Sequence, residues 1–318
     1  MIELISYGAF FLTLALTFAI MCLGLNVQWG QTGLFNVGVA GFVAIGAYVS
    51  ALLTTPDVPE RLGGFGLPIA VGWIAAVAAT ALASALLGGL TIRLRSDYLA
   101  IATFGFAVVV QLAALNLQSI TGGPFGISFI PRPFGTFAGD PLVFGLLNLA
   151  VVSAVTLGVY VALEHLMRSP WGRVLRAIRE DEQAATALGK NAISFRIQSF
   201  AVGGAIMGLA GAVQAHFIGY ISPEGYVPIL TFQVWAMLIV GGSGNNRGAI
   251  LGAIVVWAFW AASGAVIAAL VPPGEQARAS ALKIVMIGVA ICLVLLLRPR
   301  GLLGELKTVS RHIEDGKS

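Results

Sequence analysis

The segment 168–193 places basic residues directly before acidic ones, a pattern that suits a docking element for a soluble partner. Pro170 and Gly172 interrupt the apolar run before it, and Gly189 stands where a helix should stop. Between them, apolar residues recur at near-helical spacing, at Val174, Ile178, Ala185 and Leu188. We therefore expect a short amphipathic cytoplasmic helix or helix pair whose apolar face enters a groove of a soluble partner, with charges at the rim.

The residues expected to make this contact are Arg173, Arg176, Arg179, Glu180, Asp181, Glu182, Ala184, Ala185 and Gly189. Arg176 would pair with acidic groups of the partner, and the acidic run would pair with basic ones. The two alanines would allow a close approach. The alternative interpretation is a solvated loop whose arginines help to fix the topology of the chain.

Uncharged polar residues are concentrated in a second stretch, near the end of the first apolar run. They are Asn26, Gln28, Gln31, Thr32 and Asn36, and glycines stand among them at positions 24, 30, 33 and 38. A helix that is broken at membrane depth can offer N–H and C=O groups to a zwitterion or an amide, so we predict part of a substrate pathway here. Tight packing, with the amides capping loose backbone, is the alternative.

Two further polar residues, Gln111 and Thr121, lie toward the outer end of the fourth apolar run and just beyond it. We include them in the predicted pathway as an outer gate or vestibule. The alternative is a capped helix end followed by a turn.

Reactive clusters are missing from the sequence. No group of His, Cys or carboxylate residues predicts a catalytic or metal site, and no basic stripe predicts a nucleic-acid partner. Gly189-Lys190-Asn191 lacks the first glycine and the Ser/Thr of a phosphate-binding loop, so any ATP and Mg would be bound by partner subunits. No acidic residue lies near the centre of an apolar run, which disfavours a stand-alone ion-coupled carrier without eliminating it.

The elements that must position these residues are membrane-spanning helices. The chain is 58% hydrophobic and 10% charged, whereas soluble domains carry about 25% charged residues. We therefore predict an all-α polytopic membrane protein with about nine transmembrane helices (eight to ten). The predicted spans are 4–25, 31–53, 67–90, 98–118, 141–163, 194–217, 227–241, 248–270 and 281–297. The second span begins among Gly and Asn residues, and the seventh is short.

The distribution of Lys and Arg predicts the orientation. With the N-terminus outside, thirteen of these residues fall in inside segments and three in outside segments, which favours an N-out, C-in topology. Residues 1–300 then form a single transmembrane domain, and 301–318 form a short polar cytoplasmic tail.

Glycines repeat at four-residue spacing in two places, at Gly204 and Gly208 and at Gly244, Gly248 and Gly252. Small residues at this spacing let helices approach closely. The sequence leaves open whether the contact is within this chain or with a second membrane subunit.

Several motifs resemble those of one family. Gln183-Ala184-Ala185-Thr-Ala-Leu-Gly189 resembles the Glu-Ala-Ala-x-x-x-Gly coupling motif of ATP-binding-cassette importer permeases, with Gln183 in place of the acidic residue. The longer run from Gly172 to Gly189 is similar to permeases of the high-affinity branched-chain amino acid importer, and within that family to the M-type subunit. The similarity continues at residues 24–38, 98–105, 121–127, 221–223 and 241–244, and it covers roughly residues 20–300.

The resemblance implies a permease subunit of an ATP-driven importer for branched-chain or other neutral amino acids, in the cytoplasmic (inner) membrane of a bacterium. It implies a second homologous permease subunit, two ATPase subunits that hydrolyse ATP, and an extracytoplasmic substrate-binding protein. That protein would dock on the outer loops around 54–66, 119–140 and 218–226. Permeases for urea or short amides remain an alternative within the family, and a stand-alone secondary carrier remains an alternative outside it.

Overall fold

The computed structural model describes residues 2–59, 61–137, 139–270 and 301–304, and the single positions 272, 275, 285, 288, 289, 292 and 296. Within these residues the chain forms α-helices and short 3-10 helices, with two isolated bridges and no β-strand. The predicted all-α class is confirmed for this part of the chain.

The α-helices are α1 (Ile2–Gln28), α2 (Val39–Thr54), α3 (Ile69–Thr91), α4 (Ser96–Asn116), α5 (Gln118–Thr121), α6 (Pro141–Arg168), α7 (Pro170–Glu180), α8 (Glu182–Ala187), α9 (Ala192–Ile218), α10 (Pro228–Gly241) and α11 (Asn246–Leu270). The 3-10 helices are η1 (Gly123–Phe125), η2 (Gly135–Phe137) and η3 (Pro223–Tyr226). Among the described residues, six helices are long and apolar enough to cross a membrane, namely α1, α3, α4, α6, α9 and α11. The ninth predicted span, 281–297, lies outside the described stretches, so the count of nine stays a prediction.

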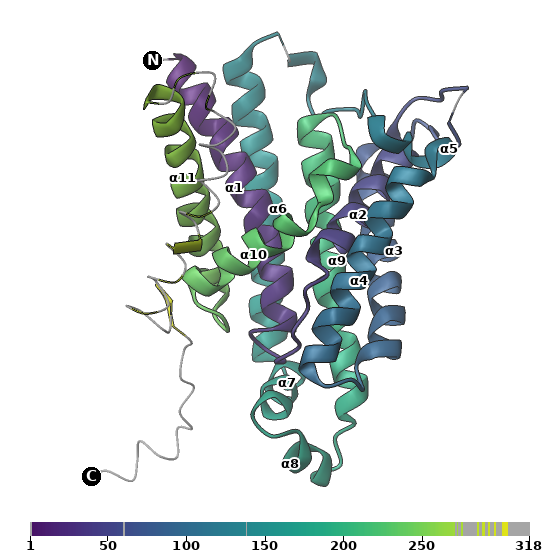
Figure 1. The fold of residues 1–318 in the computed structure, drawn as a ribbon, viewed down its shortest axis with the longest axis vertical. Helices are drawn as coiled ribbons and strands as arrows, with labels where there is room; N and C mark the ends of the chain where they lie inside the picture. The colour runs from purple at the N-terminus through teal and green to yellow at the C-terminus, as the bar shows by residue number, and fades with distance from the viewer. Residues whose placement is uncertain are drawn as a thin grey trace.

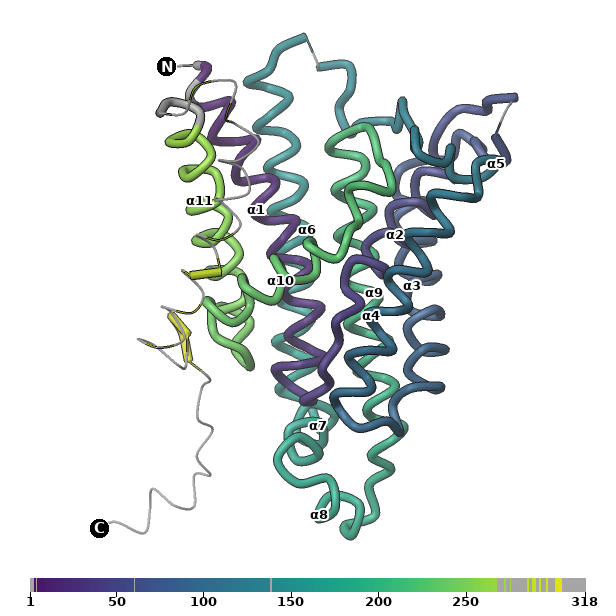
Figure 2. The backbone as a smooth tube through the Cα atoms, viewed as in Figure 1, coloured from purple at the N-terminus to yellow at the C-terminus, as the bar shows by residue number. Residues whose placement is uncertain are grey.

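The second and seventh predicted spans correspond to the short helices α2 and α10, of 16 and 14 residues. At about 1.5 Å per residue these helices cover about 24 and 21 Å, less than the roughly 30 Å of a hydrocarbon core. Each follows a segment without α-helix, 29–38 or 219–227, and Figure 2 traces both segments through the backbone.

Helix α2 starts eight residues later than predicted because the chain at 31–38 is not helical. Gly33 has φ +74°, which a helix does not accept. A Cβ on Gly30 would overlap the side chain of Asn26 and the backbone of Gly244, so this turn requires a residue without a side chain.

Helices α1 and α9 form the inside of the bundle. In their apolar stretches 67% and 61% of residues are buried, against 17–22% in α3, α4, α6 and α11. Helix α9 packs against α1, α2 and α3, and α1 also packs against α6 and α11. The four outer helices therefore present the apolar faces that a bilayer would cover. Figure 1 shows how the helices are arranged.

The predicted packing glycines on α9 make contacts within the chain. A Cβ on Gly204 would meet the side chain of Ser84, and one on Gly208 would meet that of Thr80, both on α3. On the opposite side, a Cβ on Gly46 of α2 would overlap the backbone of Gly208. Three helices thus meet at Gly208, where the backbones of α2 and α9 approach closely and α3 contributes the side chain of Thr80.

Of the glycines in the other predicted repeat, two pack against a neighbouring helix and one forms a turn. Gly248 and Gly252 on α11 face α10, where an added Cβ would meet backbone atoms of Gly241. Gly244 was expected in the same repeat, but it lies in the turn between α10 and α11 with φ +84° and belongs to no helix. Its spacing matched the repeat because the turn directly precedes α11.

Candidate functional site

Helices α7 and α8 form the predicted helix pair at 168–193, which we call the docking element. Pro170 occupies the first turn of α7, where its missing N–H costs no hydrogen bond. Asp181 caps α8 by accepting a hydrogen bond from the Ala184 N–H at 2.9 Å. Gly189, with φ +77°, follows α8 and turns the chain toward α9. Figure 1 shows the element projecting from the end of the bundle opposite the N-terminus.

The docking element has a small apolar core of its own. Val174, Ile178, Ala185, Ala192 and Phe195 pack together and hold α7 and α8 against the start of α9. Leu188 was expected on this face, but its side chain is 81% exposed. Helix α8 ends at Ala187, so Leu188 has left the helical face before the chain turns.

The basic residues of the element differ in what they contact. Arg173 is exposed and donates to the Arg168 carbonyl at 3.3 Å. Arg179 forms an ion pair with Glu180 at 2.7 Å and also donates to the Gly30 carbonyl. Arg176 is half-buried and has neither a hydrogen bond nor an ion pair within the described residues, so its charge is available to a partner.

The acidic residues are held within the chain yet remain accessible. Glu182 pairs with Arg196 of α9 at 2.9 Å, and Asp181 serves as the cap of α8. The side chains of Glu180 and Glu182 are still 71% and 45% exposed. Ala184 and Gly189 are exposed, whereas Ala185 is buried in the small core. The docking role of these residues stays a prediction.

The predicted pathway residues near the end of α1 are buried and bonded to one another and to distant helices. Gln28 donates to the Phe200 carbonyl of α9 at 2.8 Å and accepts from Asn36 at 2.6 Å. Asn26 donates to Asn246 at 2.8 Å and accepts from the Gly244 N–H at 2.8 Å. This is the arrangement of the packing alternative, in which amides cap loose backbone.

Gln31 and Thr32 continue the same network. Gln31 donates to the Gly244 carbonyl at 2.8 Å, and its Oε1 is buried without a hydrogen-bond partner in the described structure. The Thr32 hydroxyl donates to the Val27 carbonyl at 2.9 Å and lies 2.6 Å from the Ser199 hydroxyl. All five predicted residues are 4% exposed or less, and a part in substrate passage stays a prediction.

Side chains from two other helices, α4 and α10, complete backbone hydrogen bonds of segment 29–38 and of the first turn of α2. Thr103 of α4 accepts from the Val37 N–H at 2.9 Å. Trp235 of α10 donates to the Asn36 carbonyl at 2.9 Å, and Thr231 accepts from the Ala40 N–H at 3.0 Å. Non-helical backbone at membrane depth is tolerated where it is buried in protein and paired in this way.

The two residues predicted at the outer end do not join this network. Gln111 is half-buried on α4. Thr121 is 7% exposed, donates to the Ala114 carbonyl at 2.6 Å and accepts from the Gly123 N–H at 3.2 Å. Thr121 therefore closes a helix end, as in the alternative interpretation, and a gating role stays untested.

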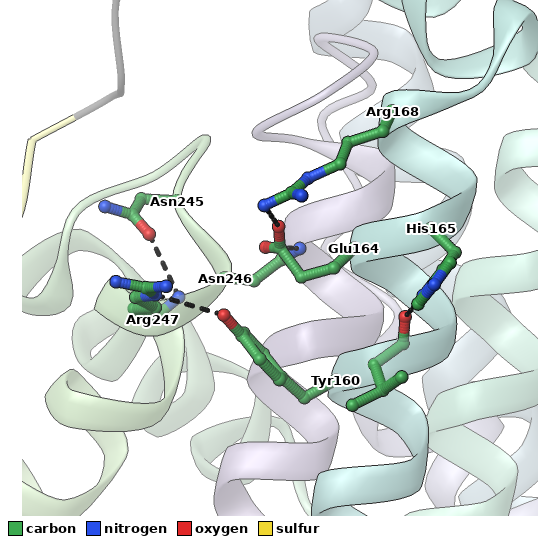
Figure 3. Close-up of polar contacts among 8 residues, drawn as sticks. Tyr160, Glu164, His165, Arg168, Asn245, Asn246 and Arg247 are labelled. Atoms are coloured by element: carbon green, nitrogen blue, oxygen red, sulfur yellow. Dashed lines mark hydrogen bonds and ion pairs between the residues drawn. The ribbon is translucent and has the colours of Figure 1, made fainter.

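A polar cluster lies where α6 meets the start of α11, as Figure 3 shows. Asn246 donates to Glu164 at 3.1 Å, and Glu164 pairs with Arg168 at 3.5 Å. Arg247 donates to the Tyr160 hydroxyl at 3.1 Å. An open hollow of about 450 Å³ beside the cluster is lined by Tyr160, Val161, Glu164, His165 and Arg168 of α6 and by Ser169, and none of the predicted pathway residues lines it.

Several members of the buried network were not predicted from the sequence: Thr103, Ser199, Thr231, Trp235, Asn245 and Asn246. The Asn245-Asn246 pair directly after a Gly-rich turn was a usable signal, because two adjacent amides between apolar runs need partners. The single hydroxyl and indole residues gave no signal, since their partners lie far away in the sequence.

Among the described residues, no group of three His, Cys, Asp or Glu side chains is arranged to hold a metal ion. The site consists instead of one exposed docking element and one buried network of uncharged groups.

The comparisons with known proteins agree on one family. The model of the family "Branched-chain amino acid transport system / permease component" matches residues 8–295. The chain is 36% identical to the high-affinity branched-chain amino acid transport system permease protein LivM of Escherichia coli, over 92% of this chain and 68% of that protein. It is 28% identical to a probable LivM permease of Methanocaldococcus jannaschii, over 74% and 75%. It is 26% identical to the LivH permease of Salmonella typhimurium, over 92% and 93%. No solved structure gives a significant match.

Proposed function

Because the chain belongs to the family of permease components of branched-chain amino acid transport systems, we propose that it is the membrane subunit of an ATP-driven importer for branched-chain or other neutral amino acids. The relatives are transport permeases and not enzymes. The observation that carries the proposal is family membership over nearly the whole chain, joined to an exposed helix pair at one end of an apolar bundle.

In this proposal the substrate crosses the membrane without any change in its bonds. ATP and Mg bind to two separate ATPase subunits, and their movement reaches the bundle through the docking element. A second homologous permease subunit completes the pathway. The buried network supports this proposal because its pathway residues carry no charge, which suits a neutral zwitterion more than a strongly charged solute.

The topology that we propose is N-out, C-in, in the cytoplasmic membrane of a bacterium. Family membership and six apolar helices identify a multi-pass membrane protein. The end that carries the docking element holds most of the arginines in the described loops, and the N-terminus lies at the opposite end (Figure 1).

The outer loops are joined into one surface that suits the binding protein. Leu62 donates its N–H to the Ser119 carbonyl at 2.7 Å. Ile127 and Ile221 exchange two backbone hydrogen bonds of 2.9 and 3.0 Å. Phe125 and Phe129 on this surface are 80% and 86% exposed. Exposed aromatic side chains are frequent anchors of protein–protein interfaces.

We expect the double variant Phe125→Ser and Phe129→Ser to lower binding-protein-dependent uptake by about tenfold, the size of a lost interface anchor. Stability should change little because both rings are exposed. The measurement is uptake at increasing concentrations of the binding protein. ATP hydrolysis without the binding protein serves as the control and should stay normal. An unchanged response to the binding protein would remove these two residues from the docking surface.

The proposed function is tested in proteoliposomes that contain this chain with its second permease and ATPase subunits. Labelled leucine should enter only when both ATP and the binding protein are present. Unlabelled valine should compete, whereas urea and acetamide should not. Competition by urea or acetamide instead would support the alternative substrate class. Uptake by this chain alone, without nucleotide, would identify a carrier and refute the importer.

A further inference from the structure

A series of hydrogen bonds joins the docking element to the inside of the bundle. It begins at Arg179 on α7, whose guanidinium donates to the Gly30 carbonyl in the turn that follows α1. Arg179 also packs beside Gly33 of the same turn, where an added Cβ would lie 3.3 Å from its Cγ. The side chain of Arg179 is only 21% exposed, so this contact is largely shielded from water.

The turn held by Arg179, at residues 29–33, is hydrogen-bonded to a second turn, which lies between α10 and α11. Gln31 donates to the Gly244 carbonyl at 2.8 Å, and Asn26 accepts from the Gly244 N–H at 2.8 Å. Both backbone groups of Gly244 are therefore fixed by amides from the α1 end. Any displacement of the turn at 29–33 must displace the turn between α10 and α11 or break these bonds.

The second turn is connected in the same way to α6. Asn246, at the start of α11, accepts from Asn26 at 2.8 Å and donates to Glu164 at 3.1 Å. Figure 3 shows Asn246 directed at Glu164, with Arg168 on the other side of the carboxylate. The path thus reaches α1, α10, α11 and α6, although α7 has few direct contacts beyond α6, α8 and α9.

One group in this path lacks a partner. Gln31 is 4% exposed, and its Oε1 is buried with no hydrogen bond in the described part of the chain. An unsatisfied buried acceptor is costly, and it is rare in a region that is optimised for one conformation. It suits a joint that adopts a second arrangement during the transport cycle.

We propose that Arg179 is a positioning residue that transmits movement of the docking element to the bundle through the Gly30 carbonyl, Gln31 and the turn at Gly244. The proposal rests on the proposed function, because it assigns the route by which the ATPase subunits act on the pathway. Arg173 lies on the same helix but donates to the Arg168 carbonyl, and so it lies outside this route.

The test compares Arg179→Met, Arg179→Lys and, as the control, Arg93→Met in the reconstituted importer. Arg93 is an exposed arginine between α3 and α4 and lies outside the docking element. The quantity measured is labelled leucine taken up per ATP hydrolysed, with ATPase-subunit binding recorded for each complex. We expect Arg179→Met to lower this ratio by about fivefold or more while ATP hydrolysis continues. Arg179→Lys keeps one donor and should recover most of the ratio. Arg93→Met should resemble the wild type.

A second variant tests the same route with little risk of misfolding. Gln31→Met removes the bond to Gly244, but it also removes the unpaired Oε1, so little loss of stability is expected. It should lower the same ratio. A normal ratio in both Arg179→Met and Gln31→Met, or an equal loss in Arg93→Met, would overturn the inference. If the wild type itself shows no ATP-dependent uptake, it is the proposed function that fails.

Discussion

Replacing Leu188 with Glu should release the ATPase subunits from the permease and abolish most transport. Leu188 is 81% exposed at the tip of the docking element, beside the exposed Ala184. A partner that covers this side chain removes its apolar surface from water, and burial of a Leu side chain is worth about 2 kcal/mol. This corresponds to about 30-fold weaker binding. The measurement is the amount of ATPase subunit that co-purifies with the tagged permease.

The stability of the permease itself should stay within about 0.5 kcal/mol, because exposed positions contribute little to folding. Leu62→Glu is the matched control, since Leu62 is 67% exposed but lies on the outer loops at the other end of the bundle. It should keep its ATPase subunits. If Leu188→Glu keeps them as well, the tip of α8 is not part of the contact.

Leu188 also illustrates how far the sequence determined the docking element. Proline, glycine and the charge pattern predicted a helix pair at 168–193, and the structure has α7 and α8 there. The spacing placed Leu188 on the inner apolar face with Val174, Ile178 and Ala185. Periodicity assumes one continuous helix, and here Asp181 separates α7 from α8 while α8 ends one residue before Leu188.

Only the part of the buried network near the end of α1 was predicted from the sequence. Asn26, Gln28, Gln31 and Asn36 were recognised because polar residues among glycines are unusual in an apolar run. Their partners were not, because they lie far along the chain, with Asn246 220 residues from Asn26 and Phe200 172 residues from Gln28. Hydropathy measures composition along the chain, whereas pairing depends on which helices are neighbours.

The same limit explains the boundaries of the short helices. Residues 31–53 are apolar enough to read as a span, yet 31–38 is a paired non-helical segment. Its backbone is satisfied by Thr103 and Trp235, and such partners have no signature in the segment itself. Helices with many apolar residues and no such partners, such as α3, were predicted to within two residues at either end.

The contact of α2, α3 and α9 at Gly208 provides the second large effect. Replacing Gly208 with Val should prevent the bundle from folding, because the first added carbon already overlaps the buried side chain of Thr80. Overpacking of a core costs about 1–3 kcal/mol and more where backbones touch. Gly158→Val on α6 is the control, since an added Cβ there meets nothing within 4 Å. The measurement is the yield of monodisperse protein after detergent extraction.

A compensating pair tests whether the contact itself is responsible. The three atoms nearest to a Cβ on Gly208 all belong to the Thr80 side chain. Gly208→Ala combined with Thr80→Gly should therefore be more stable than Gly208→Ala alone, although a glycine inside α3 costs about 1 kcal/mol. Gly46→Ala meets only backbone atoms of Gly208, so Thr80→Gly should not rescue it. Equal rescue of both alanine variants would mean that Thr80→Gly loosens the bundle generally, and the close approach at Gly208 would not be the cause.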